Sequence, residues 1–157
     1  MSSKTTILKL LQKKLELFTQ YEKETDNLLS ASLDTMEDYI TNRAAIANDI
    51  DAISCEIHNI FAANEDKILQ DTVLCKCNDS KVKAEHREIY EVSKQIYAII
   101  SRVQETEKQI TESMKLTRAK LKERINDTKN TPKIARYLEN LTAGREDGFL
   151  SDLEKKV

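Results

Sequence analysis

Apolar residues recur about every three and a half positions through most of this chain, which is the spacing of coiled-coil helices. The longest such stretch runs from Ser80 to Lys129 and contains no proline or glycine. It predicts a helix of roughly 75 Å, at about 1.5 Å per residue. A helix of this kind is stabilised by packing of its apolar stripe, so it needs partner helices. The stripe comprises Val82, His86, Ile89, Ser93, Ile96, Ile100, Val103, Glu107, Ile110, Met114, Thr117, Leu121 and Ile125.

Two shorter helices are predicted ahead of the long one, over residues 4–30 and 33–63, with a tight turn at Ser30-Ala31-Ser32. The first has an apolar stripe wide enough to contact two neighbours. Its stripe is Ile7, Leu11, Leu15, Phe18, Glu22, Thr25 and Leu29, and that of the second is Met36, Tyr39 or Ile40, Arg43, Ile46, Ile50, Ile53, Ile57 and Ile60. The pattern predicts an all-α protein, an elongated antiparallel three-helix bundle or coiled coil with a long third helix and a short C-terminal helix.

One charged residue, Arg43, falls on the apolar stripe of the second helix. A buried cation costs several kcal/mol unless it is paired. We therefore predict that Arg43 either extends outward on its aliphatic stem or meets an acidic residue of the first helix.

The periodic pattern weakens at two places. Residues 64–79 have enough apolar positions for one or two helical turns before the long helix, which is predicted to span residues 80–129. Thr131 and Pro132 end that helix and begin a short one, because threonine caps helices and proline is tolerated at the first helical position. We thus expect a bundle over residues 1–129, and a short helix with a mobile tail over 130–157 that is a possible partner-binding segment.

The lengths of the helices suggest a binding site. The two shorter helices span roughly 40 to 47 Å and the long one about 75 Å, so packing should end near Ser113 while the apolar stripe continues. That stripe must be covered by the short C-terminal helix, by a second copy of the chain, or by a helix of another protein. The candidate partner-binding residues are Met114, Leu121, Ile125, Ile134, Tyr137, Leu138 and Leu141.

Composition and charge narrow the possible functions. A third of the residues are charged and only two are glycine, which disfavours turn-rich β folds. The net charge is −2, but residues 1–80 carry 8 basic and 14 acidic side chains and residues 81–129 carry 12 and 8. Complementary facing helices explain this better than a nucleic-acid surface, because Glu123 and Asp127 interrupt the basic side chains between Lys115 and Lys129. Without a long apolar run or a signal-peptide layout, we expect a cytoplasmic protein that does not insert into membranes.

We expect no catalytic, cofactor or metal site, and no enzymatic activity. The chain has no glycine-rich phosphate loop, no nucleophile elbow and no Glu-x-x-His pair. Cys55, Cys75 and Cys77 are odd in number, and the spacing of Cys75 and Cys77 is too short for a usual zinc knuckle. We therefore expect reduced thiols, whose role the sequence leaves open.

Several stretches also resemble a known protein family. They are Leu10-Leu11, Leu15, Tyr21, Leu28-Leu29, Asp34, Met36, Tyr39-Ile40, Thr41-Asn42-Arg43, Ile46, Ile50 and Ile53, then Lys133–Leu141 and Asp152-Leu153-Glu154-Lys155-Lys156. This layout resembles the flagellar type III secretion chaperones of the FlgN class and, less closely, the FliT class. The resemblance implies a cytoplasmic chaperone that binds helical termini of hook–filament junction proteins and delivers them to an export apparatus component. A homo-oligomeric coiled-coil scaffold, in the simplest case a homodimer, and another kind of helical adaptor are the alternatives.

Overall fold

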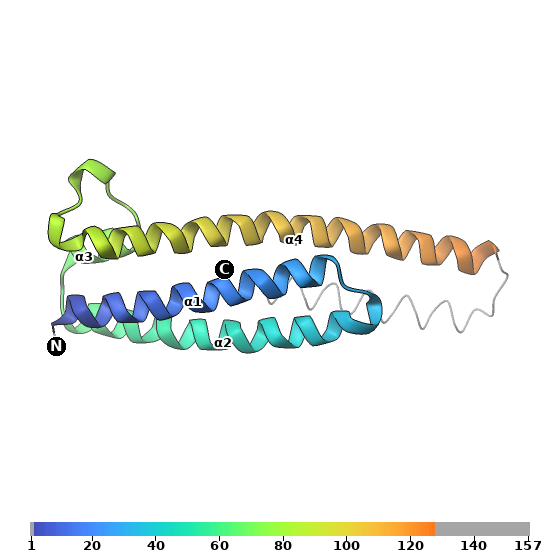
Figure 1. Cartoon of the computed structure of the whole chain (residues 1–157), viewed down its shortest axis with the longest axis horizontal. Coiled ribbons are helices and arrows are strands. Elements are labelled where there is room, and N and C mark those ends of the chain that lie inside the picture. The colour runs from blue at the N-terminus through green and yellow to red at the C-terminus, as the bar shows by residue number, and fades with distance from the viewer. Residues whose placement is uncertain (1, 128–157) are drawn as a thin grey trace.

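The computed structural model describes residues 2–127, which form helices joined by short turns without any β-strand in this range. Its elements are α1 (Ser3–Leu29), α2 (Leu33–Ala63), α3 (Lys67–Val73), two 3₁₀ turns, η1 (Asp79–Lys81) and η2 (Ala84–His86), and α4 (Arg87–Asp127). The predicted all-α class is confirmed. The three long helices lie side by side, with α2 antiparallel to α1 and α4 running in the same direction as α1 (Figure 1).

The ends of the first helices follow from local capping. The Ser2 side chain accepts a hydrogen bond from the Thr5 backbone N–H at 3.3 Å, which begins α1 one residue before the predicted start. Ser30-Ala31-Ser32 forms the predicted turn, and α2 has the predicted limits. Asp66 caps α3 by accepting from the Leu69 N–H at 3.0 Å, so the weakly periodic connector contains two helical turns.

The long helix begins at Arg87 and not at Ser80 as predicted. Residues 79–86 form η1 and η2, separated by extended backbone at Val82 and Lys83. The Arg87 guanidinium donates hydrogen bonds to the Asp79 side chain and, at 3.0 Å, to the Asp79 carbonyl. These bonds compete with helical ones and hold the segment as a loop. The described part of the helix, Arg87–Asp127, has 41 residues and measures about 62 Å, and its start lies seven residues later than predicted.

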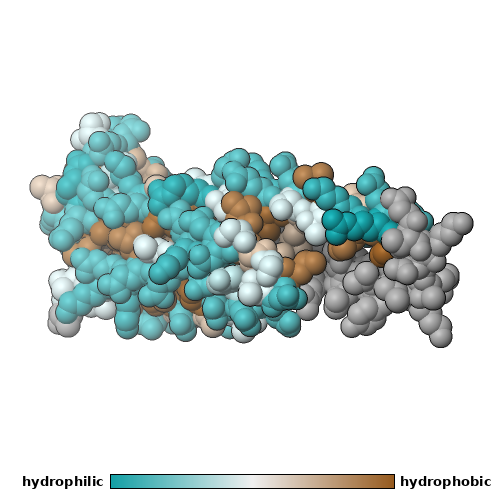
Figure 2. All heavy atoms as spheres, turned by 45° about the vertical axis from the view of Figure 1, so that its right-hand side comes forward, coloured by the Kyte–Doolittle hydropathy of each residue, from teal (hydrophilic) through white to brown (hydrophobic). Residues whose placement is uncertain are grey.

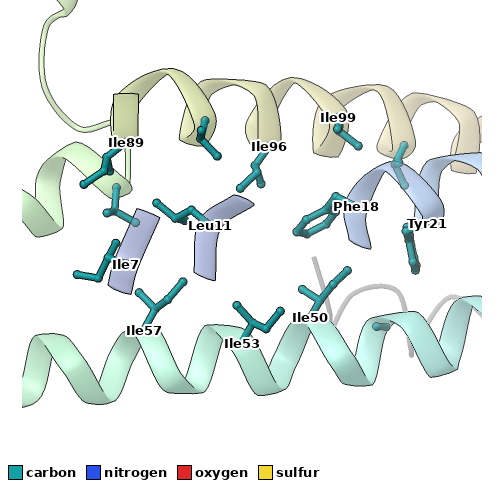
Figure 3. Close-up of a cluster of buried hydrophobic side chains, with 14 of the residues drawn as sticks. Ile7, Leu11, Phe18, Tyr21, Ile50, Ile53, Ile57, Ile89, Ile96 and Ile99 are labelled. Atoms are coloured by element: carbon teal, nitrogen blue, oxygen red, sulfur yellow. The ribbon is translucent and has the colours of Figure 1, made fainter. Parts of the chain in front are cut away.

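The core lies where the three long helices converge. Close backbone contacts join α1 to α2 and α1 to α4 along their lengths, whereas α2 and α4 approach each other closely at very few points. Figure 3 shows apolar side chains of all three helices pointing toward one another: Ile7, Leu11, Phe18 and Tyr21 of α1, Ile50, Ile53 and Ile57 of α2, and Ile89, Ile96 and Ile99 of α4. α1 is thus the helix against which the other two pack.

The buried stripe of α1 differs from the predicted one toward its C-terminal end. Tyr21 and Leu28 are buried, in place of Glu22 and Leu29. The buried residues keep a strict seven-residue repeat, from Ile7 to Tyr21 and Leu28 and from Leu11 to Phe18 and Thr25, which is the repeat of a coiled coil. The predicted stripe has a longer average spacing and is therefore one position too late at Glu22 and Leu29. Glu22 is instead half-buried and accepts hydrogen bonds of 2.8 and 3.1 Å from Arg102 of α4.

Arg43 is buried, and its acidic partner comes from α4 and not from the first helix as predicted. Its side chain is only 3% exposed, and Nη2 donates to Glu107 Oε1 at 2.6 Å and to the Tyr21 hydroxyl at 2.8 Å. The guanidinium also lies 4.6 Å from the centre of the Tyr21 ring. Burial raises the pKa of the Glu107 carboxyl, and the charge and hydrogen bond of Arg43 oppose that shift. This cluster joins the three helices at one level.

Candidate partner-binding site

The far part of α4 extends beyond the α1–α2 hairpin. Lys4 and Glu85 form an ion pair of 2.9 Å that places the start of α4 beside the start of α1. Toward the other end, Ile110 is a fully buried residue of α4, and it lies with Leu28 beside the hairpin turn. Residues 114–127, which we call the distal segment, add about 21 Å of helix from that level onward (Figure 1). Met114 still packs against the core, and Thr117 and Leu121 are the last residues of α4 that line a groove together with the hairpin turn.

A groove of about 240 Å³ lies between the hairpin turn and the beginning of the distal segment. We call it the distal groove. Its lining is Leu28, Leu29, Ala31, Ser32, Leu33, Met36, Ile110, Ser113, Met114, Thr117 and Leu121. The side chains of Leu29 and Leu33 remain 37% and 53% exposed. Among residues 2–127 the lining has no charged side chain, so this part of the groove suits apolar side chains.

The structure places three of the seven predicted binding residues. Met114 and Leu121 line the distal groove, and Ile125, one turn further along α4, is half-buried. Ile134, Tyr137, Leu138 and Leu141 lie outside the described residues.

Sequence reasoning missed the hairpin side of the groove. Leu29 and Met36 are predicted only as packing positions of two helices, and the predicted binding residues include neither them nor Leu28 and Leu33. The turn is tight because its backbone groups form hydrogen bonds within a few residues, and Leu29 and Leu33 on either side of it stay partly exposed. The Ala31 N–H donates to the Leu28 carbonyl at 3.2 Å. The Thr35 and Met36 N–H groups donate to the Ser32 carbonyl at 3.1 and 3.0 Å. Two leucines flanking a three-residue turn were the available signal.

The cysteines and acidic residues do not form a second site. Within residues 2–127, no group of three or more His, Cys, Asp or Glu side chains is arranged to hold a metal ion. Cys55 is an exposed free thiol, and Cys75 and Cys77 are half-buried free thiols. Burial is the main cause that raises the pKa of the Cys75 thiol, and the neighbouring Cys77 adds to it. A raised pKa lowers the reactive thiolate fraction.

Apolar surface is distributed along the molecule and includes the region of the distal segment. Figure 2 shows apolar atoms in bands between hydrophilic ones, reaching toward the end of α4.

None of the helices within residues 2–127 combines the length and apolar character needed to cross a bilayer. Comparisons with protein-family models, with curated proteins and with solved structures find no match to this chain.

Proposed function

We propose that this protein is a helical chaperone that binds an amphipathic helix of a partner protein in the distal groove. The observation that carries the proposal is the apolar groove at the level where α4 passes the α1–α2 turn. Helix-in-groove recognition needs an uncharged apolar channel that accepts side chains at positions i, i+3 or i+4, and i+7 of the bound helix. Burying the exposed parts of Leu29 and Leu33 under a bound helix would contribute about 25 cal/mol of binding free energy for each Å² of apolar area.

The resemblance to the FlgN class of flagellar export chaperones suggests which partner this is. The bound helix would be the terminus of a hook–filament junction protein, which the chaperone delivers to an export apparatus component in the cytoplasm. An uncharged lining favours such a helix over nucleic acid, because phosphate recognition requires basic side chains at the contact surface.

One observation favours a different function, self-association of the chain through the other face of α4. Leu116 is 63% exposed and lies two positions from Met114, which places it on roughly the opposite face of α4. A homodimeric scaffold could bury Leu116 of both copies. Sedimentation distinguishes the two functions: a concentration-independent dimer that disappears in Leu116→Glu supports the scaffold, and a monomer supports the chaperone.

The double substitution Met114→Glu with Leu121→Glu should abolish helix capture. Two carboxylates in the distal groove would have to be desolvated by the bound apolar side chains, at a cost of about 1–3 kcal/mol or more each. We therefore expect affinity to fall by at least about 100-fold. The measurement is isothermal titration calorimetry with a peptide of the C-terminal helix of the organism's hook–filament junction protein.

Leu116→Glu is the matched control, because it introduces the same charge on the same helix outside the groove lining. It should leave the peptide affinity within about twofold, and far-ultraviolet circular dichroism should show unchanged helix content in both variants. If the groove variant binds the peptide as tightly as the unmodified chain, the distal groove is not the capture site and the proposal fails.

A further inference from the structure

A second and larger groove lies between α2 and α4 on the side nearer α3. It consists of two adjoining cavities of about 480 and 190 Å³, and Lys14, Ser54, Val73 and Leu74 line both of them. We call this continuous depression the lysine groove. It shares no lining residue with the distal groove, so the two surfaces can be altered separately.

The walls of the larger cavity are mostly apolar and those of the smaller one are mixed, and together they come from all four α-helices and the residue after α3. They include Leu11 and Phe18 of α1, Ile50, Ile57 and Phe61 of α2, Val73 and Leu74, and Ile96, Tyr97 and Ile100 of α4. The side chains of Leu74 and Tyr97 are more than two-fifths exposed. An apolar lining with partly exposed aromatic and aliphatic side chains is typical of a docking surface.

The shape of the lysine groove matches one helix. Because α2 and α4 both pack on α1 but hardly on each other, the space between them corresponds to the place of a fourth helix in a four-helix bundle. From Ile50 to Phe61, the α2 side of the groove measures about 16 Å, or three helical turns.

Two charged side chains of opposite sign, Lys14 and Asp51, lie among the residues of the lysine groove. Lys14 lines both cavities and is half-buried, and it makes no hydrogen bond or ion pair within the described part of the chain. Burial lowers the pKa of the Lys14 ammonium group, and Asp51, which also lines the groove, partly opposes this. A cation in an apolar environment is unfavourable until an anion pairs with it. The groove is therefore complementary to a ligand with one carboxylate among apolar groups.

We propose that the lysine groove binds a three-turn amphipathic helix of a partner protein that carries one aspartate or glutamate within its apolar face, paired with Lys14. The three-turn length and the two flanking helices favour a helix over a small amphiphile. The charge of Lys14 favours an acidic position in that helix. This site is separate from the distal groove, and it stands or falls independently of the function proposed there.

A peptide selection tests the proposal with the full chain. Phage carrying a library of three- to four-turn helices, with fixed leucines at helical spacing and random residues between them, would be selected on the unmodified protein. The selected peptides should carry an aspartate or glutamate between the leucines. Each would then be synthesised in its acidic form and in the corresponding asparagine or glutamine form, and its affinity measured for the unmodified chain, Lys14→Met and Lys14→Arg.

We expect Lys14→Met to lower the affinity for the acidic peptide by at least tenfold. The amide form of the peptide should bind the unmodified chain with a similarly reduced affinity. Combining Lys14→Met with the amide peptide should cause no further loss of affinity. Lys14→Arg should retain binding, and the melting temperature of Lys14→Met should be unchanged or higher because a half-buried charge has been removed. The distal variant Met114→Glu with Leu121→Glu should bind the same peptide normally.

Three outcomes would overturn the proposal. One is a selection that yields no peptide or only peptides without an acidic residue. Another is equal affinity of the acidic peptide for the unmodified chain and Lys14→Met. The third is binding of laurate that depends on Lys14 when no peptide does, since this would identify the occupant as a small amphiphile.

Discussion

Replacing Glu107 by leucine should lower the free energy of unfolding by about 3–5 kcal/mol. The substitution keeps a side chain of similar size but leaves the Arg43 guanidinium, 3% exposed, without its anionic partner at 2.6 Å. Removing one member of a buried pair is costly because the other charge stays desolvated. Urea denaturation followed by far-ultraviolet circular dichroism gives the free energy, and the slope of the transition checks that the denatured state has not changed.

The same substitution at Glu22 is the matched control. Glu22 also pairs with an arginine of α4, Arg102, at 2.8 Å, but the Arg102 side chain is largely exposed to solvent. Since surface pairs contribute little, Glu22→Leu should leave the denaturation midpoint nearly unchanged. The double variant Arg43→Met with Glu107→Leu should recover most of the stability lost in Glu107→Leu, because neither charge is then buried. A small loss at Glu107, or equal losses at both sites, would contradict the assignment of this pair as a buried link between the helices.

The positions of the long helices could be predicted from sequence because their apolar spacing is regular and their ends are polar. The limits of α2 agree with the prediction, since Ser32 precedes it and Asn64 follows it. The start of α4 could not be predicted, because nothing in the spacing of Val82 and His86 reveals the hydrogen bonds between Asp79 and Arg87. Periodicity also could not identify the partner of Arg43, because that depends on which residue of another helix lies at the same level.

The candidate sites were predictable only in part, for a related reason. Comparing helix lengths located the α4 side of the distal groove, including Met114 and Leu121. The hairpin side depends on which of Leu28 and Leu29 faces the core, a difference of one position: Leu28 keeps the seven-residue repeat of Ile7 and Tyr21, and Leu29 does not. Lys14 lies on the repeat of the buried α1 residues, seven positions after Ile7 and seven before Tyr21, but the predicted stripe had Leu15 there and a lysine in a helix normally faces solvent. It becomes notable only when α2, α4 and the end of α3 surround it.

Residues of α4 before the level of the hairpin turn should contribute mainly to the stability of the fold, and those beyond it mainly to the binding of a partner helix. Ile110→Ala is expected to cost about 2–5 kcal/mol of unfolding free energy, because Ile110 is 2% exposed and its removal leaves a cavity in the core. Leu121→Ala should cost less than about 1 kcal/mol, since Leu121 is only half-buried and lies in the distal groove. Urea denaturation of the two variants measures both values under the same conditions.

Helix capture should show the opposite order. Leu121→Ala removes apolar contact area from the groove and should weaken the bound helix by roughly 1–3 kcal/mol, about 5- to 150-fold in affinity. Ile110→Ala should weaken it less under conditions where the variant remains folded, because Ile110 is already covered by the protein's own residues. If Leu121→Ala destabilised the fold as much as Ile110→Ala, the distal segment would be part of the core. Its apolar side chains would then be committed to the protein's own packing, and the groove would have no contact surface left to offer a partner.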